Sequence, residues 1–138
     1  MEVKKDFIER EIQKLTLLLI DLIDKIKGLN SNNAESGIQE TNKVLKSEFD
    51  LTLREIIQME NSELLKYITD LHELHIEKLT ELIYEVVRKI YLSDSELSKK
   101  QEKEKLVQKS ILLLNYLDEK SNIFSIKRME LKNALQAL

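Results

Sequence analysis

The residues that come nearest to a chemical site are the two histidines. His72 and His75 are three residues apart, with Glu73 and Glu77 beside them. On a helix the two imidazoles share one face, and they could bind zinc or iron together with carboxylates from another helix. The spacing misses the zinc-protease pattern His-Glu-x-x-His and the di-iron pattern Glu-x-x-His. We therefore expect two half-exposed histidines on a solvated face. A metal-binding enzyme or sensor built on His72 and His75 is the alternative.

Other residue types offer little further chemistry. The chain has 138 residues and no cysteine, which excludes a thiolate zinc site and a cysteine nucleophile. Most carboxylates stand three or four residues from a lysine, as on a solvated helix face, and not in a desolvated acid–base pair. The sequence has neither a glycine-rich phosphate loop nor a G-x-S-x-G motif. We expect a protein that is not an enzyme and needs no cofactor.

The elements that would position any site are predicted to be helices. The chain has no proline and only two glycines, the residues that interrupt helices and form turns. Its length favours one domain over residues 1–138. Apolar residues recur in steps of three and four along most of the chain. We predict an all-α fold: an array of six or seven helices, either a short solenoid or an irregular bundle.

The first predicted helix, about Lys4 to Lys27, has the strongest pattern. A heptad seam runs along it, widened by Phe7 and Ile23, and Gly28 stands where a C-terminal glycine would end the helix. The seam residues are Ile8, Ile12, Leu15, Leu19, Leu22, Ile26 and Leu29. Leu17 falls about 160° from Leu19 on the helical wheel, and Leu18 and Ile20 about 100° to either side. This apolar girdle predicts that Leu17 is covered, either by a neighbouring helix of the same chain or by a second subunit or partner.

Further helices are predicted from the same spacing, and Leu79 joins Leu19 as an expected core residue. Their boundaries between residues 58 and 76 stay open. The proposed helix starts are Asn32 with Glu35, Asp50, Asn61 or Ser62, and a capping box of Ser93 with Glu96. Short turns make consecutive helices antiparallel neighbours.

Charge and localisation signals limit the classes of partner. The net charge is −3, so we expect no nucleic acid, although a mildly basic C-terminal part leaves that as a third possibility. The run Lys99–Lys105 could bind an acidic partner or form a wet surface. The uncharged stretch nearest the N-terminus, Leu15 to Ile20, is too short for a signal peptide or a membrane span. We expect a cytoplasmic protein that does not enter a membrane.

The opening segment Asp6-Phe7-Ile8-Glu9-Arg10-Glu11-Ile12 resembles the start of an uncharacterised bacterial family of tetratricopeptide-like helical proteins. Residues 77–138 also look like stacked helix pairs. The resemblance implies helix pairs and no catalytic residues. One departure concerns alanine, which tetratricopeptide repeats use where their helices cross, because this chain has only Ala34, Ala134 and Ala137.

These observations favour a non-enzymatic protein–protein interaction module, because a helical array leaves an extended surface for a partner. Leu17 is the candidate partner-binding residue, and a homodimer is one form that the partner could take. The sequence names neither the partner nor the pathway.

Overall fold

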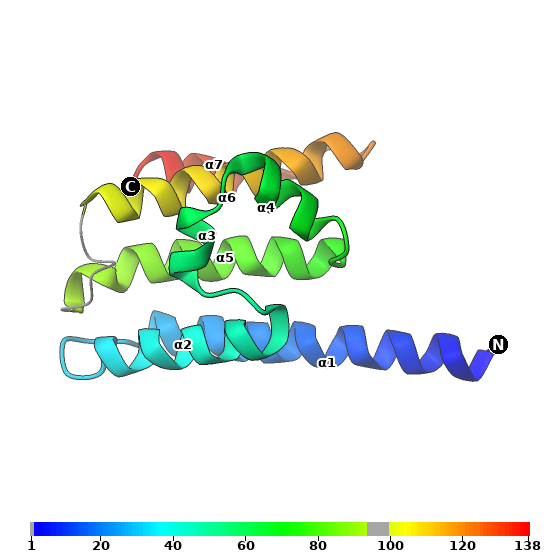
Figure 1. Ribbon diagram of the computed structural model, residues 1–138, viewed down its shortest axis with the longest axis horizontal. Helices are drawn as coiled ribbons and strands as arrows, with labels where there is room; N and C mark the ends of the chain where they lie inside the picture. Colours follow the sequence, from blue (N-terminus) through cyan, green and yellow to red (C-terminus); the bar gives the residue numbers. More distant parts are fainter. Residues whose placement is uncertain (1, 94–99) are drawn as a thin grey trace.

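The computed structural model describes residues 2–93 and 100–138, with the side chains of residues 2 and 3 left out (Figure 1). Every regular element of these described parts is helical, which confirms the predicted all-α fold. They contain seven α-helices and one short 3-10 helix. The elements are α1 (Glu2–Lys27), α2 (Ala34–Phe49), α3 (Leu53–Gln58), α4 (Asn61–Ile68), α5 (Glu73–Lys89), η1 (Ile90–Leu92), α6 (Lys100–Lys120) and α7 (Ile126–Gln136). The proposed capping box of Ser93 with Glu96 reaches outside the described residues.

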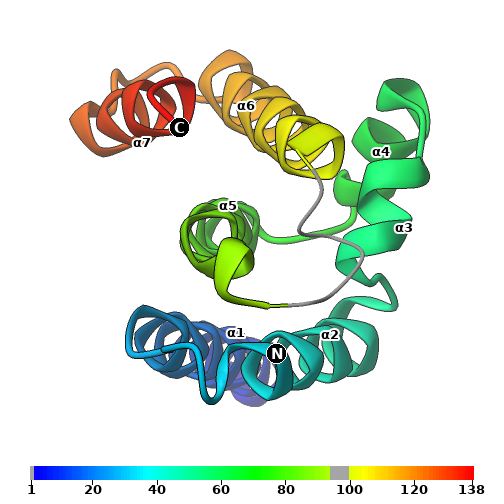
Figure 2. The ribbon, with the colours of Figure 1, turned by 90° about the vertical axis from the view of Figure 1, so that its left-hand side faces the viewer.

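Helix α5 occupies the centre of the molecule. Figure 2 shows it above α1 and below α6 and α7, with α3 and α4 linking the two levels along one side. Its buried side chains point in several directions around the helix, because neighbours cover it on several sides. They are His75, Ile76, Leu79, Thr80, Leu82, Ile83, Glu85, Val86 and Val87. Leu19 and Leu79, the two expected core residues, are both buried in the same apolar cluster.

Two contacts show that α1 and α5 run in the same direction. The Nε2 atom of His75 lies 3.0 Å from the backbone oxygen of Ile12, near the start of α5. Near its end, the Nζ atom of Lys89 donates to the backbone oxygen of Leu29 at 3.1 Å. Helices α2 and α6 run the opposite way, and α7 again follows α5 (Figure 1). The expected antiparallel pairs α1/α2 and α5/α6 are therefore present.

The helix ends differ in detail from the predicted ones. Helix α1 ends at Lys27 as expected, but Gly28 does not adopt the left-handed conformation. Asp50, predicted to start the third helix, instead ends α2 in the left-handed conformation. Helix α3 is instead capped by Thr52, whose side chain forms a capping box with Glu55. The prediction missed this pair because Asp50 also has a side chain suited to capping.

Two further predicted starts are displaced by one residue. Asn33, not Asn32, precedes α2, without a capping bond from its side chain. Glu60 precedes α4, and the side chain of Asn61 instead accepts a hydrogen bond of 2.7 Å from the buried amine of Lys109. Lys109 also donates to the backbone oxygen of Met59, and it thereby ties α6 to the turn between α3 and α4.

A charged cluster attaches α7 to the rest of the molecule. Asp118 on α6 accepts hydrogen bonds from Lys132 and, at 2.6 Å, from Arg128. Lys127 forms an ion pair of 2.7 Å with Glu81 on α5. Burial alone would raise the pKa of Asp118, but the hydrogen bonds and charges of Lys132 and Arg128 outweigh it and lower that pKa.

Candidate interaction surface

The two histidines have separate backbone roles. His72 is exposed and precedes α5, where its Nδ1 atom accepts a hydrogen bond of 3.1 Å from the backbone N–H of Leu74. His75 is only 6% exposed and contacts the backbone oxygen of Ile12 through Nε2. The expectation of two half-exposed histidines on a solvated face is therefore wrong for His75, because α1 packs over it.

The same contacts bear on metal binding. The rings of His72 and His75 lie 5.6 Å apart between centroids and are tilted by 53°. A metal would need one nitrogen from each ring and further carboxylate ligands around a common point. Within the described residues, no group of three or more histidine, aspartate or glutamate side chains could hold a metal ion. The pair therefore does not fit a metal centre in this arrangement.

The apolar girdle around the middle of α1 is buried on one side only. Leu19 is fully buried against the core, whereas Leu17 is 66% exposed. Leu18 and Ile20 are each 37% exposed. None of the described helices covers Leu17, so the first of its two predicted explanations is wrong. The second, cover by a second subunit or a partner, stays a prediction.

The exposed part of α1 continues towards its start. In Figure 1 this end of α1 projects past both α2 and the start of α5. Phe7 is 60% exposed and Ile8 is 49% exposed, although the heptad pattern places both at or beside the core seam. The heptad pattern continues through Phe7 and Ile8, but α5 does not reach far enough to cover them. Helix α5 begins only at Glu73, opposite the middle of α1.

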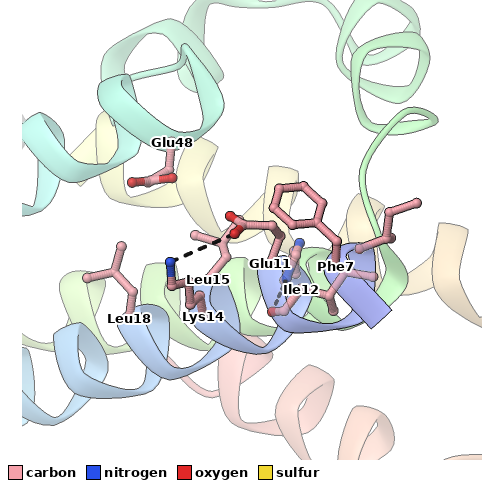
Figure 3. Close-up of a pocket in the computed structure, with 9 residues that line it drawn as sticks. Phe7, Glu11, Ile12, Lys14, Leu15, Leu18 and Glu48 are labelled. Atoms are coloured by element: carbon pink, nitrogen blue, oxygen red, sulfur yellow. Dashed lines mark hydrogen bonds and ion pairs between the residues drawn. The ribbon is translucent and has the colours of Figure 1, made fainter. Parts of the chain in front are cut away.

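A groove runs along this exposed part (Figure 3). It has a volume of about 540 Å³. Apolar side chains of α1 form most of its wall, Glu48 of α2 stands across from them, and His75 of α5 also lines it. The lining residues of α1 are Phe7, Ile8, Glu11, Ile12, Lys14, Leu15 and Leu18. The groove is therefore an apolar channel with two acidic residues and one lysine at its edges.

A second groove lies among α5, α6 and α7, with a volume of about 610 Å³. It includes Lys100 and Lys103 from the basic run predicted as a possible binding segment, and Arg88 from α5. Lys99 lies outside the described residues. Arg88 is paired with Glu85 at 3.4 Å, and Glu104 also lines the groove, so the positive charge is partly balanced there.

Comparison with known proteins identifies no relative of this chain. No family model matches the chain, and neither a curated protein nor a solved structure matches it. Among the described residues, no helix combines the length and apolar character needed to cross a membrane.

Proposed function

We propose that this protein is a non-enzymatic protein–protein interaction module that binds through the exposed half of α1. The observation that carries the proposal is the collection of large apolar side chains that α1 leaves in water. Phe7, Leu17, Leu18 and Ile20 are all more than one third exposed on this one helix. Isolated exposed leucines are ordinary, but several large side chains on one helix beside an apolar groove are typical of an interaction surface.

The architecture supports the same proposal. Helices α1, α5 and α7 share one direction, and α2 and α6 run against them, as in arrays of helix pairs. We propose on this basis a tetratricopeptide-like arrangement, in keeping with the resemblance to that bacterial family. The six-residue α3 and eight-residue α4 between the pairs depart from a regular repeat. A cytoplasmic location belongs to the proposal and is supported by the lack of cysteine.

The metal-binding alternative has weaker support. Nε2 of His75 already contacts Ile12, and Nδ1 of His72 already accepts the N–H of Leu74. Both histidines have a structural role that needs no metal. Metal analysis of untagged protein decides this point, because stoichiometric zinc or iron would revive the alternative.

Photo-crosslinking tests the proposed surface directly. A photoreactive phenylalanine analogue replaces Leu17 in one variant and the exposed Glu119 of α6 in a matched control. We expect irradiation in the native host to give one or a few defined protein adducts from position 17 and none of these from position 119. The adduct masses identify the bound protein, whether it is a different chain or a second copy. Equal, diffuse labelling from both positions would contradict the proposal.

A further inference from the structure

Six exposed residues of α1 form a second heptad stripe beside the buried seam. Their spacing alternates between three and four, and all six are exposed. We call this set the outer stripe: Lys4, Phe7, Glu11, Lys14, Leu18 and Asp21. Four of its members, Phe7, Glu11, Lys14 and Leu18, also line the groove in Figure 3. The outer stripe is therefore a surface along which another helix could lie.

The order of residues in the outer stripe is complementary to its own reverse. About the midpoint between residues 12 and 13, Phe7 mirrors Leu18 and Glu11 mirrors Lys14. Lys4 likewise mirrors Asp21. Two such helices, packed antiparallel about a twofold axis at that midpoint, would place each apolar residue against an apolar one and each acid against a base. An interface on a twofold axis requires this self-complementarity, whereas a surface shaped for a different partner does not.

We propose that two copies of this chain form a dimer in which their α1 helices pack antiparallel along the outer stripe. Phe7 of each copy contacts Leu18 of the other, and Glu11 of each pairs with Lys14 of the other. This inference rests on the proposed function, since it names the partner of that same surface. The projecting start of α1 from one copy then lies beside the groove of the other, where Glu48 stands.

The exposure of these side chains fits the proposal. Phe7 is 60% and Leu18 is 37% exposed in the single chain, and both would be covered in the dimer. Leu17, at 66% exposure, lies next to the outer stripe at the edge of the same contact. Within one chain, Glu11 and Lys14 are 3.8 Å apart and 52% and 78% exposed, so both can pair across the interface. One helix pair buries less than the roughly 1,600 Å² of a standard interface, and we expect a dissociation constant in the micromolar range.

Analytical ultracentrifugation of the full chain tests the dimer over concentrations of about 1 to 500 μM. We expect wild type to pass from monomer to dimer over this range. The variants Phe7→Glu and Leu18→Glu bring charges into the apolar pairs and should weaken the dimer about 100-fold. The matched control is Ile123→Glu, which changes a 79% exposed residue between α6 and α7 and should dimerise like wild type. A wild type that stays monomeric at every concentration would overturn the proposal.

A charge exchange tests the register independently. In the dimer of Glu11→Lys, the new lysine of each copy faces Lys14 of the other. In the dimer of Lys14→Glu, the new glutamate of each copy faces Glu11 of the other. Each should weaken the dimer about tenfold. The double variant restores both opposite-charge pairs and should dimerise like wild type. Thermal melts of the variants at low concentration exclude unfolding as the cause. A double variant no better than the single variants would overturn the pairing of Glu11 with Lys14.

Single cysteines test the same register covalently, because the chain has none of its own. Phe7→Cys mixed with Leu18→Cys should give a disulfide-linked dimer, since the paired Cα atoms must approach within about 7 Å. Phe7→Cys alone should not, because the two copies of residue 7 would be about 16 Å apart along the helices. Equal cross-linking in both samples would overturn the antiparallel register. A monomeric wild type whose position 17 cross-links to a different protein would leave the proposed function standing and remove the dimer.

Discussion

Helices α1 and α5 carry similar apolar seams, yet their surroundings differ. In α5 the structure buries nine residues on several sides of the helix. In α1 the apolar girdle predicted cover on two sides, but Leu17, Leu18 and Ile20 stay exposed. The difference shows that apolar residues reveal what a helix can bury, whereas its position in the array decides what it does bury.

The reason lies in the neighbours that each helix has. Helix α5 packs against α1, α6, α7 and η1. Helix α1 lies at the edge, against α5 and α2. Its start projects past both of them. An edge helix with an apolar outer side therefore keeps a surface that a second molecule can cover.

The largest expected effect is in the central helix. Leu79 is 1% exposed within the core cluster, and Leu79→Ala should lower the free energy of unfolding by about 2–5 kcal/mol, through lost burial and a residual cavity. Urea unfolding followed by circular dichroism measures this. Leu17→Ala, on the exposed side of α1, is the control. Equal losses of unfolding free energy in the two variants would contradict the contrast between the buried α5 and the exposed side of α1.

His75 gives the next largest effect, at the contact between the two helices. His75→Ala removes a buried ring and one of the hydrogen bonds to the backbone oxygen of Ile12, which keeps the bond from the Thr16 hydroxyl, so we expect a cost of about 1–3 kcal/mol. Such a loss is larger than we would expect from a half-exposed histidine on a solvated face, which is what the sequence predicted. His72→Asn, which keeps an oxygen able to accept from Leu74, should cost less. A chelator that lowered the melting temperature of wild type as much as His75→Ala does would contradict a purely structural role.

Asp118 should make the contact of α7 depend on pH. The pKa of Asp118 is lowered in the folded protein, so its contribution is present above the unfolded pKa of about 3.9 and is lost as pH falls through the lower folded value. The variant Asp118→Asn should therefore be less stable than wild type at pH 7. The difference should shrink as the pH falls from about 4 towards 2. Urea midpoints of both proteins across this range measure it, and a difference that grows in acid would contradict the assignment.

The smallest expected effect on stability is at Leu17. Because this side chain is 66% exposed, Leu17→Lys should change the free energy of unfolding of the monomer by no more than about 0.5 kcal/mol. Thermal melts at low micromolar concentration, where dimerisation contributes little, measure it. A loss comparable to that of Leu79→Ala would show that α1 is covered within its own chain after all.

Local sequence was informative where one residue type decides the outcome. The lack of proline and the regular spacing predicted an all-α fold of six or seven helices, and Gly28 predicted the end of α1 at Lys27. Prediction failed where several residues compete for one role, as when Thr52 and not Asp50 starts α3. A close contact within the fold was not predicted either: at Gly37, inside α2, an added Cβ would overlap the side chain of Leu29. That contact joins α2 to the turn between α1 and α2, and no local sequence pattern indicates it.

The sequence by itself determined that this chain is helical, which face of each helix is most apolar, and that Leu19 and Leu79 belong to the core. These properties follow from local periodicity, which backbone geometry converts directly into faces. Only the tertiary structure decided that α5 is central and α1 peripheral, that His75 is buried against Ile12, and that Phe7 and Leu18 line an open groove. Each of these depends on the relative length and offset of helices far apart in the chain. Such offsets arise from packing between whole helices, and no single helix encodes them.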